Sequence, residues 1–165
     1  MVLETDRLRL REMTLADAPF LLELMTEPAF IQNVADRGLR TTADAERWMS
    51  EKILPSYTRY RFGFYLLESK ESGVPVGICG LIKREVLDDP DVGYAILTRH
   101  SGNGYAYEAA AAVMTYGRRT LGLPRIIGVT SPANATSIRI LEKLGLRFER
   151  MVKLPQFEKP SMLFS

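Results

Sequence analysis

The segment Asp91–Val129 constrains the fold more than any other, because a strand pattern, a glycine-rich loop, a helix pattern and another strand pattern follow one another there. The helix is predicted over about Tyr105–Leu121, where Gly122 and Pro124 end it. Two strands joined through a loop and a helix form a crossover connection, which makes the strands parallel. Ligands of open α/β sheets bind at the carboxyl ends of such strands, which points to residues 95–106.

Other strand and helix patterns surround this unit. Strands are predicted at Leu8–Arg11, Phe62–Glu68, Val76–Lys83, Asp91–Thr98, Arg125–Val129, Leu146–Lys153 and Ser161–Phe164. Helices are predicted from Thr14 to Glu27–Pro28, from Thr41 or Thr42 to Pro55, and from about Asn134 to Leu144. Short turns between the three middle strands favour antiparallel pairing. With no repeat or linker in the chain, we expect a single α/β domain over residues 1–165, a mixed sheet covered by helices.

Composition excludes several classes of protein. The chain has 165 residues, 22 basic and 20 acidic side chains, and a formal net charge of +2, so it lacks the basic excess of a general nucleic-acid binder. A single cysteine, Cys79, and a single histidine, His100, exclude a disulfide framework and a Cys/His zinc cluster. No apolar run is long enough to cross a membrane, and no signal peptide is visible. We therefore expect a cytoplasmic protein without metal, nucleic-acid or membrane partners.

The loop Arg99–Gly104 has the composition of an anion-binding cradle. Its glycines let a bulky anion approach the backbone, and the first amides of the following helix point toward that anion. Arg99 could add a forked, charge-assisted contact. A dinucleotide fingerprint would need glycine where Tyr107 stands, and the Gly-Lys-Ser/Thr of a Walker loop is absent. The pattern Arg/Gln-x-x-Gly-x-Gly/Ala fits; the alternative is a flexible turn without a ligand.

Motifs along almost the whole chain resemble the GNAT N-acetyltransferase superfamily, in particular its RimJ/RimL-type branch. They are Leu3-Glu4-Thr5-Asp6-Arg7-Leu8-Arg9-Leu10-Arg11, Val92-Gly93-Tyr94-Ala95-Ile96, Gly102-Asn103-Gly104-Tyr105-Ala106-Tyr107-Glu108-Ala109, Asn134-Ala135-Thr136-Ser137-Ile138 and Leu141-Glu142-Lys143-Leu144-Gly145-Leu146. The resemblance implies a GNAT-like fold, with a mostly antiparallel central sheet, a splayed parallel strand pair and flanking helices. It also implies acetyl-CoA as a cosubstrate.

The resemblance places the pantetheine arm of acetyl-CoA between the splayed strands, paired with backbone groups near Ile96 and Leu97, whose alternative role is core packing. Amides of Ser101 to Ala106 would hold the pyrophosphate. The residues expected to bind acetyl-CoA are Ile96, Leu97, Thr98, Arg99, Ser101, Gly102, Asn103, Gly104, Tyr105, Ala106, Asn134 and Ser137.

Two side chains are the candidates for proton transfer. The family reading places Ser137 beside the departing sulfur, whereas many relatives use a tyrosine as general acid at the position of Leu141. Ser137 or an ordered water is then the expected proton donor; the alternative is that Asn134 is only a helix cap and Ser137 a first-turn polar residue. Asp91 is the candidate general base. Glu85 and Asp89 stand behind it, and all three could instead be solvated surface acids.

Four further residues receive structural or secondary roles. Glu108 is expected to be structural, His100 an exposed loop residue, and Cys79 a buried thiol. Trp48 and Tyr57 could wall the acceptor site or simply pack.

The expected activity is acetyl transfer from acetyl-CoA to a primary amine, on a protein N-terminus or a small molecule, by direct attack in a ternary complex. A non-catalytic acyl-CoA sensor or scaffold is the alternative, and a nucleic-acid module a distant third. A monomer or a homodimer is expected.

Overall fold

The computed structural model describes all residues from Met1 to Ser165 and contains two antiparallel sheets. The larger sheet has its strands in sequence order: β1 (Leu3–Glu4), β2 (Leu8–Glu12), β3 (Phe64–Ser69), β4 (Pro75–Ile82) and β5 (Asp91–Ile96). The three middle strands pair antiparallel as predicted, with Cys79 opposite Tyr94 in the register of β4 and β5. β5 therefore forms one edge of this sheet.

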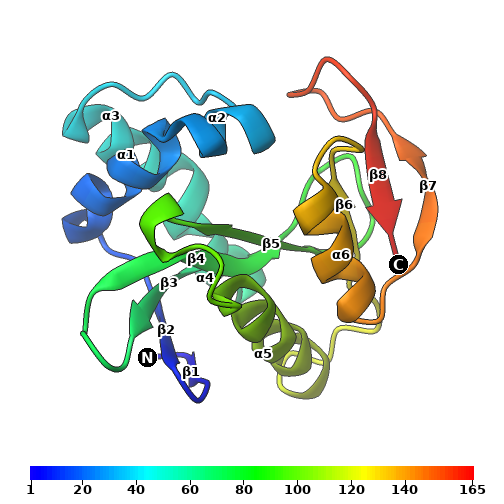
Figure 1. The fold of residues 1–165 in the computed structure, drawn as a ribbon, viewed down its shortest axis with the longest axis horizontal. Helices are drawn as coiled ribbons and strands as arrows, with labels where there is room; N and C mark the ends of the chain where they lie inside the picture. Colours follow the sequence, from blue (N-terminus) through cyan, green and yellow to red (C-terminus); the bar gives the residue numbers. More distant parts are fainter.

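The smaller sheet contains β6 (Gly128–Thr130), β7 (Phe148–Val152) and β8 (Ser161–Phe164), in the order β6-β8-β7. A single parallel bridge, between Asp91 and Ile127, joins it to the larger sheet. β5 and β6 start together at that bridge and then separate (Figure 1). The predicted α/β fold, a mostly antiparallel sheet with a splayed parallel pair, is confirmed.

Helices cover both faces of the larger sheet because its strands alternate apolar side chains. Leu66 and Ile78 pack with Leu21 and Met49 on one face, while Leu67 packs with the helix on the other face. The first face carries α1 (Ala18–Thr26), α2 (Pro28–Asn33), α3 (Thr42–Trp48), a π-helical turn (Met49–Ile53) and α4 (Leu54–Tyr60). The second face carries α5 (Tyr105–Arg119), and α6 (Ala135–Lys143) lies beside the smaller sheet (Figure 1). None of these helices is both long and apolar enough to span a bilayer.

Short helical turns mark the two ends of the sheet. One is η1 (Leu15–Asp17), where the backbone N–H of Thr14 donates to the Asp17 carboxylate at 2.9 Å, as in a capping box. The other is η3 (Thr98–His100), which follows β5 and leads into the glycine-rich loop.

Prolines account for the main difference between the predicted and observed helices. The helix predicted to stop at Pro55 continues to Tyr60, because Pro55 lies in the first turn of α4, where a missing N–H costs no hydrogen bond. Pro28 likewise begins α2 directly after α1 ends. The strand predicted at Arg125–Val129 is shorter and later, since only Gly128–Thr130 pairs with β8.

Candidate active site

Along the edge of β5 that faces away from β4, backbone N–H and C=O groups have no strand partner. The amide of Leu97 donates to the carbonyl of Val76 at 2.9 Å, so the alternate residues Ile96 and Tyr94 turn their backbone groups away from β4. On that side, the amide of Val92 donates to the carbonyl of Ile127 at 2.8 Å. Beyond this contact no strand pairs with β5. The backbone groups of Tyr94 and Ile96 can therefore accept an extended ligand as if it were an added strand.

This geometry corrects the expectation for the backbone of Leu97. The Leu97 amide is bonded to Val76, and its carbonyl accepts from the His100 amide at 2.9 Å. The amide and hydroxyl of Thr98 both donate to the Glu27 carboxylate, at 3.0 and 3.3 Å. Leu97 is fully buried. Its backbone has no free group for a cofactor arm, so that role falls to Ile96 alone.

The loop after η3 presents a run of free amides. The backbone N–H groups of residues 102–107 donate no hydrogen bond to any protein acceptor. Gly102 and Gly104 both have φ of +79°, a conformation that glycine adopts without strain. A β-carbon at Gly102 would meet nothing within 4 Å. The loop and the N-terminus of the 15-residue α5 thus form an accessible anion cradle.

Polar side chains of the loop hold its shape. The Ser101 hydroxyl donates to the Thr98 carbonyl at 2.7 Å, and the Asn103 amide donates to the His100 carbonyl at 3.0 Å. Arg99, predicted to contact the anion, forms an ion pair with Glu23 of α1 and is 57% exposed in its side chain. An anion bound in the cradle would therefore share the positive charge of Arg99 with the Glu23 carboxylate.

Glu108 joins the N-terminal strands to the first turn of α5. Its carboxylate accepts from the Thr5 hydroxyl at 2.6 Å, the Arg7 amide at 3.0 Å and the Arg7 guanidinium at 2.7 Å. Burial alone raises the pKa of this carboxyl, but these hydrogen bonds outweigh it and the net pKa is lowered. The expectation that Glu108 is structural agrees with these contacts.

Ser137 lies in the first turn of α6, directly opposite Tyr94 of β5. Asn134 caps the helix, since its side-chain oxygen accepts from the Ser137 amide at 3.1 Å. The Tyr94 hydroxyl lies 3.0 Å from the Ser137 hydroxyl and donates to the Ser137 carbonyl at 3.3 Å. Burial raises the pKa of Tyr94 to about 12, so its phenol remains protonated at neutral pH. The two hydroxyls form a protonated pair between the splayed strands.

Tyr94 is the functional candidate that sequence reasoning missed. Its neighbours Val92 and Ile96 share its face of β5, and this alternation was the available signal. Leu141, at the position where many relatives place a tyrosine, is 1% exposed. A β-carbon at Gly128 would lie 2.4 Å from its side chain, so Leu141 fills the space beside β6. In this protein the phenol beside the Ser137 hydroxyl is that of Tyr94, which comes from β5 and not from α6.

Asp91 begins β5 at the opposite end from the cradle. Its side chain is 2% exposed and accepts from the Arg84 Nε at 2.5 Å. Burial raises the pKa of this carboxyl, although the charge and hydrogen bond of Arg84 oppose that shift. Asp91 is thus a buried, paired group and not a solvated surface acid. Of the two acids behind it, Glu85 is exposed and Asp89 lies 3.6 Å from Arg125.

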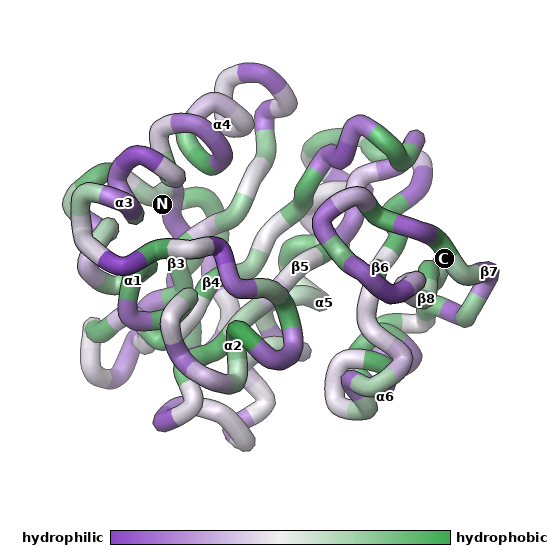
Figure 2. Tube along the Cα trace, turned by 90° about the horizontal axis from the view of Figure 1, so that it is seen from above, coloured by the Kyte–Doolittle hydropathy of each residue, from purple (hydrophilic) through white to green (hydrophobic).

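A single cleft of about 1800 Å³ connects these groups, running from Gly102 and Gly104 past Tyr94 and Ser137 to Asp91. Figure 2 shows α1–α4 on one side of β5, with α6 and the smaller sheet on the other. Single ligand pockets usually have volumes of about 300–1,000 Å³. This cleft therefore has room for two substrates at once.

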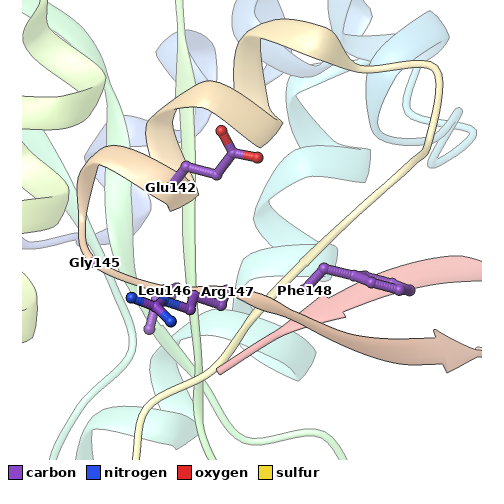
Figure 3. A pocket seen from close by; sticks show the side chains of 5 residues that line it. All are labelled: Glu142, Gly145, Leu146, Arg147 and Phe148. Carbon is purple, nitrogen blue, oxygen red and sulfur yellow. The ribbon is translucent and has the colours of Figure 1, made fainter.

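A separate hollow of about 400 Å³ lies at the turn after α6 (Figure 3). Glu142, from α6, and Phe148, from β7, contribute side chains to it. It contains none of the predicted site residues, so the large cleft is the candidate active site.

Trp48 and Tyr57, the two residues that could wall the acceptor site or simply pack, lie in different surroundings. Trp48 lines the cleft. Tyr57 does not: its hydroxyl accepts from the Met13 amide at 3.0 Å and donates to the Phe64 carbonyl, and its ring stacks on Tyr65. Tyr57 therefore packs α4 against the sheet.

The lone thiol lies away from the chemistry. Cys79 is fully buried in β4, as predicted, and burial raises its pKa well above the usual range. It is therefore a poor nucleophile.

Comparisons with known proteins agree with this geometry. The family model for an acetyltransferase (GNAT) domain matches residues 7–147. The Bacillus subtilis protein YkkB is 28% identical over 164 residues, which are 98% of this chain and 93% of YkkB. The N-acetyltransferase p20 of Bacillus licheniformis is 28% identical over 155 residues, which are 92% of this chain and 85% of p20.

Solved structures share the whole fold. A GNAT-family acetyltransferase from Bordetella pertussis superposes with a TM-score of 0.82 at 26% identity, covering 99% of this chain and 98% of its own. The ribosomal L7/L12 alpha-N-protein acetyltransferase RimL, solved with coenzyme A, gives a TM-score of 0.84 at 15% identity, covering 99% and 95%. The matching domain and the shared fold establish that this chain belongs to the GNAT acetyltransferase family.

Proposed function

We propose that this protein transfers the acetyl group of acetyl-CoA to a primary amine by direct attack within a ternary complex. The observation that carries the proposal is the continuity of one cleft, from free amides at residues 102–107, along the open edge of β5, to the Tyr94–Ser137 pair. A protein N-terminus and a small-molecule amine are both acceptors of the proposed kind. We expect it to act in the cytoplasm, as a monomer or a homodimer.

The residues present fit acetyl-CoA. The cradle donors would hold the pyrophosphate, and the unpaired backbone of Ile96 would pair with the pantetheine arm. Asn134 would face the arm from the start of α6. Acetyl-CoA supplies a thioester that an amine attacks directly, so the protein needs no nucleophile of its own.

Three groups of the chain would assist the reaction. The amide of Ile96 points away from β4 and would donate to the carbonyl oxygen as negative charge develops there. Ser137, bonded to Tyr94, would deliver a proton to the departing sulfur, the Tyr94 phenol would hold that hydroxyl in place, and water in the cleft would return the proton to Ser137.

Asp91 would act as the general base that takes a proton from the amine. It precedes Tyr94 by three residues, a distance of about 10 Å along a strand. Proton transfer over that distance requires a relay of water within the cleft. Burial raises the pKa of this carboxyl, and the ion pair with Arg84 opposes that shift and so favours the charged form.

Thiol release tests the proposal. The protein is incubated with acetyl-CoA and a pool of primary amines, peptides with free N-termini and ribosomal proteins, and the free thiol is measured. We expect amine-dependent release that Tyr94→Phe slows strongly. Tight acetyl-CoA binding without release from any acceptor would favour the non-catalytic sensor instead.

A further inference from the structure

The cleft contains an arginine with no partner in the protein. Three arginines are not exposed: Arg11 pairs with Asp17, Arg84 pairs with Asp91, and Arg37 has neither a counterion nor a hydrogen bond. Its Nε is buried without any acceptor. Buried polar atoms are nearly always satisfied, so an arginine with an orphaned nitrogen and no counterion is an exception, and the rest of its guanidinium is left to bind an anion.

The segment between α2 and α3 presents Arg37 to the cleft. Leu39, 5% exposed, anchors this segment in the core. The neighbouring acid, Asp36, accepts from the Gly38 amide at 2.9 Å and lies 3.4 Å from Arg40, so it does not neutralise Arg37. Arg37 therefore keeps its full charge within the cleft that it lines.

Two neighbours give this position the character of a binding site. The Arg37 guanidinium lies over the ring of Trp48, 5.8 Å from its centroid, within the range of a cation–π contact. The charge of Arg84 is close enough that it adds to burial in lowering the pKa of Arg37. Arg84 uses its Nε for Asp91, and its two terminal nitrogens make no hydrogen bond in the protein. Arg37 and Arg84 line the same cleft, and two like charges in one cleft favour an anion between them.

The position lies at the acceptor end of the cleft and not at the cofactor cradle. Arg84 is bonded to Asp91, the first residue of β5, whereas the cradle follows the last residue of that strand. The two ends of the strand, Asp91 and Ile96, are five residue steps apart, a length of about 17 Å. An anion bound here is therefore distinct from the pyrophosphate.

We propose that Arg37, with Arg84 and Trp48, forms a subsite for an oxyanion of the acceptor, so that the natural acceptor is an amine that also carries a carboxylate or a phosphate. This inference rests on the proposed function, because it specifies the acceptor of that reaction. A planar guanidinium binds both oxyanions through two parallel hydrogen bonds. The anion fixes one end of the acceptor, and its amine extends along β5 toward Tyr94.

Trp48 provides a direct readout, because it is the only tryptophan of the chain. Fluorescence is titrated with malonate and, separately, with inorganic phosphate, in the wild type, in Arg37→Gln and in the control Arg40→Gln. Arg40 lies in the same segment and is 65% exposed. We expect a saturable change in the wild type and the control, with at least about tenfold weaker binding in Arg37→Gln, as for a lost charge-assisted pair.

Turnover then identifies the oxyanion. Ethylamine is compared with β-alanine, and ethanolamine with its phosphate monoester. The charged member of at least one pair should have the lower KM, and Arg37→Gln should raise only that KM. The same response to malonate and phosphate in Arg37→Gln as in the wild type, or no saturable response in the wild type, would overturn the subsite. Calorimetry with acetyl-CoA on the same samples tests the proposed function separately, since its failure would leave the anion response intact.

Discussion

The two ends of the cleft are built in different ways. At the cofactor end, the free amides are those of Ile96 and of residues 102–107, which belong to one short segment of the chain, and most of the expected contacts come from the backbone. At the acceptor end, side chains converge from separate segments: Arg37 after α2, Trp48 in α3, and Arg84 with Asp91 around the start of β5. The cofactor end therefore depends on local conformation, whereas the acceptor end depends on tertiary packing and charge. Substitutions should affect the two ends through different measured quantities.

The largest effect is expected from Asp91→Asn, which removes the proposed base. A general base contributes about 10²–10⁴-fold to the rate, so kcat/KM should fall by at least about a hundredfold. In the wild type, activity should fall as the pH drops through a carboxyl pKa above the ordinary range, because the base must be ionised. The variant should lack this limb of the pH–rate profile. The exposed Asp88→Asn is the matched control, and an unchanged profile in Asp91→Asn would rule out the role.

At the cofactor end, Gly104→Val should weaken acetyl-CoA binding by roughly a hundredfold, because a branched side chain would crowd the cradle amides and strain a residue with φ of +79°. Gly73→Val is the matched control: its φ is +73°, with open space around it, in the turn between β3 and β4. Calorimetry measures both affinities. Equal losses in the two variants would mean that strain, and not the cradle, is responsible.

Between the two ends, Tyr94→Phe should lower kcat by about tenfold to a hundredfold while acetyl-CoA affinity stays unchanged. Ser137→Ala should have a similar effect, and the double variant should lose little more than either single one, because the two hydroxyls are bonded to each other. Tyr116→Phe, on α5 outside the cleft, serves as the control. Fully additive losses would show that the two hydroxyls act independently.

The smallest effect concerns the anchoring of the cradle helix. Glu108→Gln should reduce the free energy of unfolding by about 1–2 kcal/mol, since three hydrogen bonds lose their charged acceptor. The folded pKa of Glu108 is lowered, so its contribution is present above the unfolded value of about 4.3 and is lost as the pH falls through the folded pKa. Urea denaturation at neutral and acid pH measures this. The exposed Glu51→Gln should change neither value, and equal losses in both variants at neutral pH would contradict the anchoring role.

The contrast between the two ends also decides how much the sequence could predict. The splayed strand and the cap at Asn134 follow from local patterns, and the structure places them as expected. Of the amides predicted to form the cradle, that of Ser101 is not free, because it donates to the Thr98 carbonyl at 3.1 Å within the turn η3. The Leu97 backbone was assigned wrongly because the register between β4 and β5 decides which residues point their backbone groups toward β4. The sequence does not show that register. Tyr94 and Ser137 are 43 residues apart, so their contact is visible only in the fold. Nothing local separates Arg37 from the exposed arginines.

Single-turnover mass spectrometry with labelled acetyl-CoA examines direct transfer within this cleft. The only cysteine is buried and its pKa is raised, so no thiol of the protein is available to carry the acetyl group. On mixing with acetyl-CoA and an amine acceptor, the label should appear on the acceptor nitrogen and never on the protein. Label on Cys79, or on any other side chain before the acceptor is acetylated, would contradict direct attack in a ternary complex.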